Sequence, residues 1–138
     1  MCGIAGFYKN NKDITTSLAE NILKKMTNSL SHRGPDHLNY WYSSSSSISA
    51  ISDNSRLSIL DLSSNGNQPM FSQSNRYVIT FNGEIYNHLE IRNKIKKKKE
   101  IIWKSSCDTE TLIESIELYG VENTLNMIEG MFAFAIWD

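Results

Sequence analysis

The order of strand-like and helix-like segments constrains the fold of this chain more than any other feature. Strand-like segments cluster toward both ends of its 138 residues, and amphipathic helices lie between them. The sequence lacks the regular alternation of strand and helix that predicts a doubly wound parallel sheet. The pattern therefore predicts an α+β fold built from stacked layers.

The segment 14–30 has the clearest helical pattern. Its apolar residues at every fourth position, which lie on one face of a helix, are Ile14, Leu18, Ile22, Met26 and Leu30. Further helices are predicted at 88–99, 109–119 and 121–127. Strands are predicted at 3–8, 38–42, 48–51, 57–62, 77–81, 101–103 and 130–137.

Three positions carry signals for turns and helix ends. Asn82-Gly83 follows the predicted strand 77–81 and is the strongest short signal for a hairpin or turn. Asp108 is a good N-cap residue for the helix 109–119. Gly120 directly follows that helix and is expected to end it.

The longest apolar run is Met131–Trp137. Its length predicts a central strand buried on both faces. Because this strand lies at the very end of the sequence, we expect a domain that is incomplete at its C-terminus. We also expect residues 1–138 expressed alone to fold poorly or aggregate, since an uncovered apolar strand is a template for association.

Charge and hydropathy exclude two classes of partner. The run Met131–Trp137 is much shorter than the ~20 apolar residues of a membrane helix. A net charge of −1 gives no general electrostatic argument for nucleic acid. The lysine run 96–99 is interpreted as the solvated end of a helix, where it complements the helix dipole. We therefore expect neither nucleic acid nor membrane as a partner.

Cys2 directly follows the initiator methionine. Removal of Met1 would leave a thiol and a free α-amine on one residue, with ordinary pKa values of about 8.5 and about 7.7–8.0. This pair is a nucleophile with its own base, and it suits covalent acyl transfer. The alternative interpretation is a small buried cysteine without a chemical role.

Six short blocks along the chain favour the chemical interpretation. They are Met1–Tyr8, His32–Asp36, Arg56–Leu62, Phe81–Asn87, Cys107–Glu110 and Gly130–Asp138. In this order, they resemble the N-terminal glutaminase domain of glutamine-hydrolysing asparagine synthetases, which are class II glutamine amidotransferases. The resemblance runs from the first residue to the last, so residues 1–138 are expected to form a partial amidotransferase domain.

The resemblance implies a fold and a reaction. The fold is the four-layer αββα sandwich of the N-terminal nucleophile hydrolases. In the reaction, the Cys2 thiolate attacks the side-chain amide of glutamine, and the α-amine passes a proton to the departing ammonia. Water then hydrolyses the thioester. Asn82 and Gly83 match the oxyanion hole, with a side-chain N–H from Asn82 and a backbone N–H from Gly83.

The resemblance also assigns residues that hold glutamine. Arg56 matches the arginine that pairs with the α-carboxylate, a role that suits a planar guanidinium. Glu84 and Asp108 match the acidic residues that hold the α-amine. The backbone around Leu57, Ile59 and Leu60 is expected to complete the pocket. Simpler interpretations remain open from the residues alone: Arg56 as a surface arginine, Asn82-Gly83 as a plain turn and Asp108 as a helix cap.

The implied reaction needs no cofactor or metal in this chain, and His32, His37 and His88 lack the spacing of metal ligands. ATP and magnesium are expected in a C-terminal synthetase domain or subunit that amidates aspartate with the ammonia. No pyrophosphate loop for that chemistry occurs in these 138 residues. The cysteine content and the absence of a signal peptide indicate the cytoplasm. A homodimer of a full-length protein remains open.

Two departures and three alternatives remain. Asn54 stands where many family members have histidine, and Cys107 stands where a small polar residue is usual. Cys107 would permit an oxidative cross-link if it lay beside Cys2. The ammonia acceptor is alternatively a sugar phosphate or a sugar acid of a surface polysaccharide. A third alternative is a remnant that binds glutamine without turnover.

Overall fold

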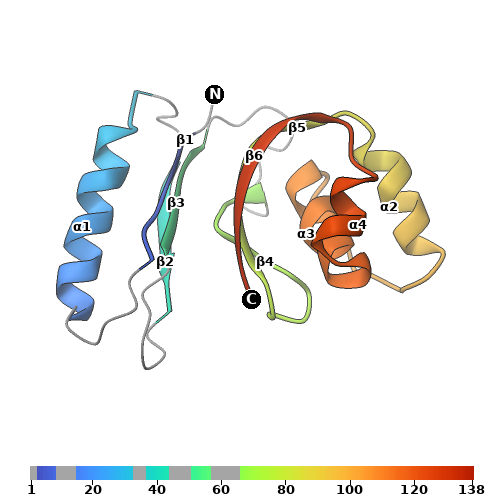
Figure 1. Cartoon of the computed structure of the whole chain (residues 1–138), viewed down its shortest axis with the longest axis horizontal. Coiled ribbons are helices and arrows are strands. Elements are labelled where there is room, and N and C mark those ends of the chain that lie inside the picture. Colours follow the sequence, from blue (N-terminus) through green and yellow to red (C-terminus); the bar gives the residue numbers. More distant parts are fainter. Residues whose placement is uncertain (1–2, 9–14, 33–36, 44–50, 57–65) are drawn as a thin grey trace.

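The computed structural model describes residues 3–8, 15–32, 37–43, 51–56 and 66–138. Two three-stranded antiparallel sheets face each other, and helices cover their outer faces (Figure 1). The first sheet has the order β1-β3-β2, from Gly3–Ala5, Ile51–Arg56 and His37–Tyr42. The second has the order β4-β5-β6, from Met70–Phe71, Val78–Ile85 and Gly130–Trp137. The helices are α1 (Thr16–Ser29), α2 (His88–Lys96), α3 (Asp108–Tyr119) and α4 (Val121–Leu125).

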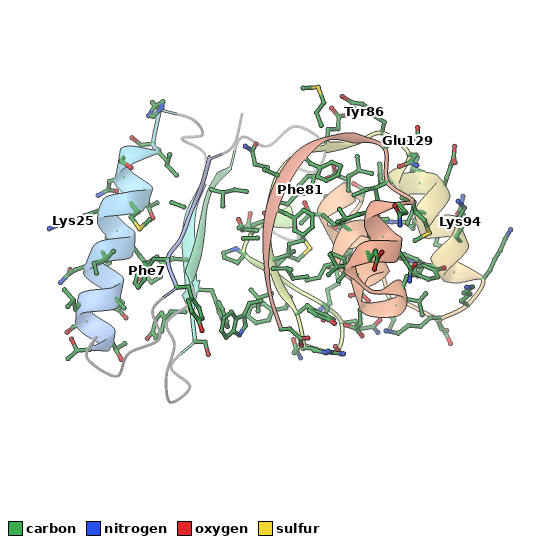
Figure 2. All side chains as sticks on the ribbon, viewed as in Figure 1. Phe7, Lys25, Phe81, Tyr86, Lys94 and Glu129 are labelled. Carbon is green, nitrogen blue, oxygen red and sulfur yellow. The ribbon has the colours of Figure 1, made fainter. Side chains whose placement is uncertain are left out.

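These layers confirm the predicted αββα sandwich. Helix α1 covers the first sheet, and α2, α3 and α4 cover the second (Figure 1). The larger core lies between the second sheet and α2 and α3, where Ile91, Ile95, Leu112, Ile113 and Ile116 are buried. On the other side, Ala19 and Leu23 of α1 pack with Phe7, Tyr40 and Tyr42 (Figure 2). In the described ranges, no helix is long and apolar enough to cross a membrane.

The contact between the two sheets is partly aromatic. The Trp137 ring of β6 lies 6.3 Å from Trp41 of β2 and 6.5 Å from Tyr8, measured between ring centroids. Trp41 also meets Phe71 of β4 edge to face, at 6.3 Å. The side of the second sheet that carries Trp137 therefore faces the first sheet.

The alternation of side chains along β5 follows from this arrangement. Ile79, Phe81 and Ile85 belong to the core under the helices. Residues between them point to the opposite face of a strand, and Val78 pairs with Trp137. Asn82 and Glu84 have the same parity as Val78, so they lie on the face directed at the first sheet.

Several sequence-based boundaries need correction. The described strand in this region is Ile51–Arg56, which shares Ile51 with the strand predicted at 48–51; residues 48–50 and the strand predicted at 57–62 lie outside the described residues. The first strand covers Gly3–Ala5 and not 3–8, and 101–103 is not a strand. Strand β6 is not buried on both faces, since Met131 is 75% exposed. Among the described strands β6 pairs only with β5, so one long edge of it has no described partner.

The predicted turn at Asn82-Gly83 is also wrong. Strand β5 runs straight through both residues, and they pair with Ala133 and Phe132 of β6. Gly83 has φ +147°, a backbone conformation that favours glycine. A Cβ atom on Gly83 would collide with the carbonyl oxygen of Met131 and with Cα of Phe132. Glycine is therefore required here by the close approach of β6.

We expect Gly83→Ala to destabilise the protein more than Gly120→Ala. Gly120 also has positive φ, at +81°, but a Cβ atom there would meet nothing within 4 Å. Gly120→Ala should therefore cost only the backbone strain of about 1–3 kcal/mol. Gly83→Ala adds a steric collision worth about 1–3 kcal/mol more. Urea unfolding of both variants measures the difference, and equal losses would contradict this account of Gly83.

Candidate functional site

Asn82 and Glu84 occupy the C-terminal end of β5, on the face directed at the first sheet. Asn82 is half-buried and pairs with Ala133, whereas Glu84 is exposed and pairs with Met131. Tyr86, just after the strand, donates its backbone N–H to the carbonyl of Glu129 at 2.7 Å (Figure 2). This end of the strand is thus held by β6 and presents an amide and a carboxylate side by side.

Asp108 lies at the same end of β5, although it belongs to α3. Its Oδ2 accepts the backbone N–H of Ile85 at 2.9 Å, and the side chain is 5% exposed. Asp108 is the first residue of α3, and the N-cap residue is Cys107, which makes no side-chain capping bond. The prediction that Asp108 is the N-cap is therefore wrong. Its carboxylate instead joins the helix to the end of the strand.

The surroundings of Asp108 oppose its ionisation only in part. Burial raises the pKa of Asp108 above its ordinary value, while the N–H of Ile85 and the nearby His88 act in the opposite direction. Burial likewise lowers the pKa of His88 and so favours the neutral imidazole. Asp108 and the exposed Glu84 together form an acidic end to β5. Such a pair is suited to a cationic group such as an ammonium.

A second contact fixes α3 against β5. The side chain of Gln68 accepts the backbone N–H of Phe81 through Oε1 and donates from Nε2 to Thr109 Oγ1 at 3.3 Å. Figure 2 shows Phe81 on the sheet beneath α3. Because Asp108 and Gln68 both join the strand to the first turn of α3, the acidic end of β5 is held from two sides.

The first sheet contributes its own strand ends to this edge of the sandwich. Gly3 at the start of β1 pairs with Ser55, and Arg56 at the end of β3 pairs with His37. The start of β1, the end of β3 and the end of β5 lie toward the same edge (Figure 1). The backbone of Arg56 and the residue after Cys2 are therefore at the edge where Asn82, Glu84 and Asp108 gather.

Four of the predicted site residues lie outside the described residues: Cys2, Leu57, Ile59 and Leu60. Of the others, the structure brings Asn82, Gly83, Glu84 and Asp108 together and places the backbone of Arg56 at the same edge.

The described residues offer neither a metal site nor a reactive cysteine at this edge. Within the described ranges, no three His, Cys, Asp or Glu side chains are grouped to hold a metal ion. The Cys107 thiol is buried and lies 3.0 Å from the Ser105 hydroxyl. Burial raises the pKa of this thiol, which disfavours the reactive thiolate.

Sequence reasoning missed Arg92 and Glu110, which surround the start of α3. Arg92 donates to the carbonyl of Cys107 at 2.9 Å, and Glu110 accepts the backbone N–H groups of Lys104 and Ser105. A signal was present: Arg92 adjoins Ile91 and precedes Ile95 on the buried face of α2. An arginine on an apolar helix face indicates a buried polar partner.

Comparison with known proteins assigns the chain to a family. Residues 1–138 match the glutamine amidotransferase domain family. Asparagine synthetase [glutamine-hydrolyzing] 1 of Bacillus subtilis is 35% identical over 138 residues, which are all of this chain and 21% of that protein. Asparagine synthetase [glutamine-hydrolyzing] 1 of Arabidopsis thaliana is 32% identical over 139 residues, which cover all of this chain and 22% of that protein. The chain thus spans about a fifth of the length of these relatives.

A solved structure supports the fold. Glutamine phosphoribosylpyrophosphate amidotransferase of B. subtilis, complexed with ADP and GMP, aligns with a TM-score of 0.70 and 20% sequence identity. The alignment covers 99% of this chain and 34% of that one. The resemblance drawn from the six sequence blocks is confirmed at the level of the family. The chain belongs to the glutamine amidotransferase domain family.

Proposed function

We propose that this chain hydrolyses glutamine to glutamate and ammonia, and that the ammonia serves ATP-dependent amidation of aspartate. The observation that carries the proposal is the gathering of Asn82, Glu84 and Asp108 at one end of β5, at the edge where β1 begins directly after Cys2. The relatives that share this domain are glutamine-hydrolysing asparagine synthetases. The proposal includes a reducing, cytoplasmic setting, in which the Cys2 thiol stays free.

In the proposed reaction, Cys2 becomes the N-terminal residue when Met1 is removed. The free α-amine of Cys2 takes the thiol proton, the sulfur forms a bond to the side-chain carbonyl carbon of glutamine, and the carbonyl oxygen becomes an oxyanion. The side-chain N–H of Asn82 and the backbone N–H of Gly83 stabilise that oxyanion. The C–N bond then breaks, and the Cys2 amine delivers the proton that converts the leaving group to ammonia. Water cleaves the thioester, which releases glutamate and regenerates the thiol.

In the same proposal, the α-amino acid end of glutamine lies between the two sheets' strand ends. Arg56 pairs with the α-carboxylate, and Glu84 and Asp108 hold the α-ammonium. The backbone near Leu57, Ile59 and Leu60 completes the pocket. The acidic end of β5 supports this assignment, because the Asp108 carboxylate is already oriented by the N–H of Ile85 and lies at the same end of the strand as the exposed Glu84. ATP and magnesium belong to the synthetase part of the proposed reaction, outside these residues.

The experiment that tests the function is a glutaminase assay of the natural full-length protein. Glutamate and ammonia should form in equal amounts, and asparagine should form when aspartate, ATP and magnesium are added. Asparagine formation from added ammonia gives the control for the second half-reaction. Absence of glutamate release under conditions that support ammonia-dependent synthesis would overturn the proposal. Ammonia transfer to a sugar acid in place of aspartate would overturn only the acceptor.

We expect Asp108→Asn to weaken glutamine binding and to change turnover little. The substitution keeps the shape of the side chain and the acceptor for Ile85, but it removes the charge that holds the α-ammonium. A charge-assisted hydrogen bond is worth about 1.5–3 kcal/mol, so KM should rise by roughly 10–100-fold. Steady-state kinetics check this result. A fall in kcat at constant KM would mean that Asp108 acts on the transition state instead.

The pH dependence of KM gives a second measurement on Asp108. Only the ionised carboxylate holds an ammonium, and burial raises the pKa of Asp108. The charge is therefore lost at a higher pH than in an exposed aspartate, and KM should begin to rise on acidification at a higher pH than an exposed aspartate would cause. Asp108→Asn should flatten this rise. Because His88 lies near Asp108, His88→Gln is the matched control, and the rise should persist in it.

A further inference from the structure

Arg92 is buried at the junction between α2 and the start of α3. Its side chain is only 9% exposed. The guanidinium donates three hydrogen bonds: from Nε to Thr111 Oγ1 at 3.0 Å, from Nη1 to the carbonyl of Ser105 at 2.8 Å, and from Nη2 to the carbonyl of Cys107 at 2.9 Å. One side chain thus joins α2, the segment before α3 and the first turn of α3.

The segment before α3 is held from its other side by Glu110. This carboxylate accepts the backbone N–H groups of Lys104 and Ser105, both at 2.9 Å, and the Ser105 hydroxyl at 2.7 Å. Its Oε2 lies 3.7 Å from Nη2 of Arg92, and both side chains are about nine-tenths buried. The ring of Trp103 packs against the guanidinium, with 4.0 Å between the ring centroid and Cζ of Arg92. The segment 103–107 is therefore fixed through its carbonyls by Arg92 and through its N–H groups by Glu110.

These contacts converge on Asp108. The carbonyl of Cys107, which Arg92 binds, belongs to the peptide bond that leads directly into Asp108. The Asp108 carboxylate accepts the N–H of Ile85 at the end of β5. The backbone of Asp108 is consequently oriented by Arg92, and its carboxylate is oriented by the end of β5.

Packing alone does not explain a buried arginine at this position. Arg92 occupies the buried face of α2 together with Ile91 and Ile95, where an apolar side chain would fill the space without desolvating a charge. Removing the guanidinium would leave the buried carbonyl of Cys107 and the partly buried carbonyl of Ser105 without these donors, which disturbs the segment next to Asp108 more than the rest of the core. The geometry of the Arg92 contacts is directional, since each of its three nitrogens donates to a different acceptor.

We propose that Arg92 is a positioning residue that sets the affinity of the protein for the α-ammonium of glutamine by fixing the segment 103–107 and the backbone of Asp108. The inference rests on the proposed function, in which Asp108 holds that ammonium. Arg92 acts through Asp108, so its substitution should change binding of the amine and leave the attack by Cys2 nearly unchanged.

The test is Arg92→Lys in the natural full-length protein. Lysine keeps the charge and the aliphatic stem but cannot donate in three fixed directions. We expect KM for glutamine to rise about tenfold, as for the loss of one hydrogen bond to a charged group, with kcat within about twofold. Glutaramate, which is glutamine without its α-amine, serves as a competitive inhibitor, and its inhibition constant should not change.

Two further variants keep the result interpretable. Thr111→Val removes one acceptor of Arg92 and should raise KM about threefold. This variant still tests the inference if Arg92→Lys does not fold. Lys99→Met removes the 3.0 Å ion pair with Glu117 at the other end of α3 and should leave KM unchanged. Thermal unfolding of each variant separates lost stability from lost affinity.

The outcomes separate the inference from the function on which it rests. A parallel rise of KM and of the glutaramate constant would show a merely structural role and overturn the inference. Unchanged KM in Arg92→Lys and Thr111→Val, together with a raised KM in Asp108→Asn, would also overturn it. If Asp108→Asn leaves KM unchanged, the proposed glutamine site is wrong, and the positioning role fails with it.

Discussion

Cys2→Ser should abolish glutamine hydrolysis in the natural full-length protein while ammonia-dependent synthesis continues. A hydroxyl with the same geometry is a far weaker nucleophile than a thiolate at neutral pH. Loss of a nucleophile reduces turnover by several orders of magnitude, so we expect a decrease of at least ~10⁴-fold in kcat. The assay compares glutamate release with ammonia-supported product formation in the same preparation.

Cys107→Ser is the matched control for that substitution. The Cys107 thiol is buried, and its pKa is raised by burial, so we assign it no chemical role. Serine is also a favourable residue at the N-cap position that Cys107 occupies. Glutamine hydrolysis should therefore survive. If Cys107→Ser lost hydrolysis and Cys2→Ser retained it, the nucleophile would be Cys107 and the assignment to Cys2 would be wrong.

Asn82→Ala should lower kcat by about 10²–10³-fold and change KM little. A donor to the oxyanion matters in the transition state, and the loss of one such donor has an effect of this size. The backbone of Asn82 pairs with Ala133 whatever its side chain, so the strand should remain intact. Steady-state kinetics on glutamine measure both constants.

Thr80→Val gives the control for Asn82→Ala. Thr80 has the same parity as Asn82 on β5, and its buried hydroxyl has no hydrogen-bond partner among the described residues. Valine has a similar shape, so activity and stability should be retained. A raised KM with unchanged kcat in Asn82→Ala would mean that the roles of Asn82 and Asp108 have been exchanged.

The parts of the fold that follow from local periodicity could be predicted from the sequence. Helix α1 (Thr16–Ser29) forms where the spacing of apolar residues predicts a helix, and Gly120 ends α3 as expected. The buried face of α1 is displaced from the predicted one, since Ala19, Leu23 and Thr27 are buried and Leu18 is exposed. Strand β3 could not be found in this way, because Ser52, Asp53, Asn54 and Ser55 have no apolar alternation. Its pairing with β1 and β2 on both sides makes it a strand.

For the candidate site, the sequence identified the residues but not the contacts that hold them. Motifs identified Asn82, Gly83, Glu84 and Asp108, which the structure brings together, but local rules misassigned how they are held. Asn82-Gly83 is predicted as a turn when only neighbouring residues are considered. In the structure, pairing with β6 makes these two residues part of a strand. Asp108 resembles an N-cap, yet its carboxylate is occupied by an N–H from 23 positions earlier in the chain. Contacts over such a separation are not readable from neighbouring residues.

The most direct measurement on the central claim is mass spectrometry of the N-terminus of an active preparation, before and after treatment with a diazoketone analogue of glutamine. We expect Met1 to be absent, one molecule of the analogue to be attached to Cys2, and glutaminase activity to fall in proportion to the labelled fraction. Retention of Met1 in a preparation that hydrolyses glutamine, or labelling at another residue that accounts for the lost activity, would contradict the N-terminal cysteine mechanism.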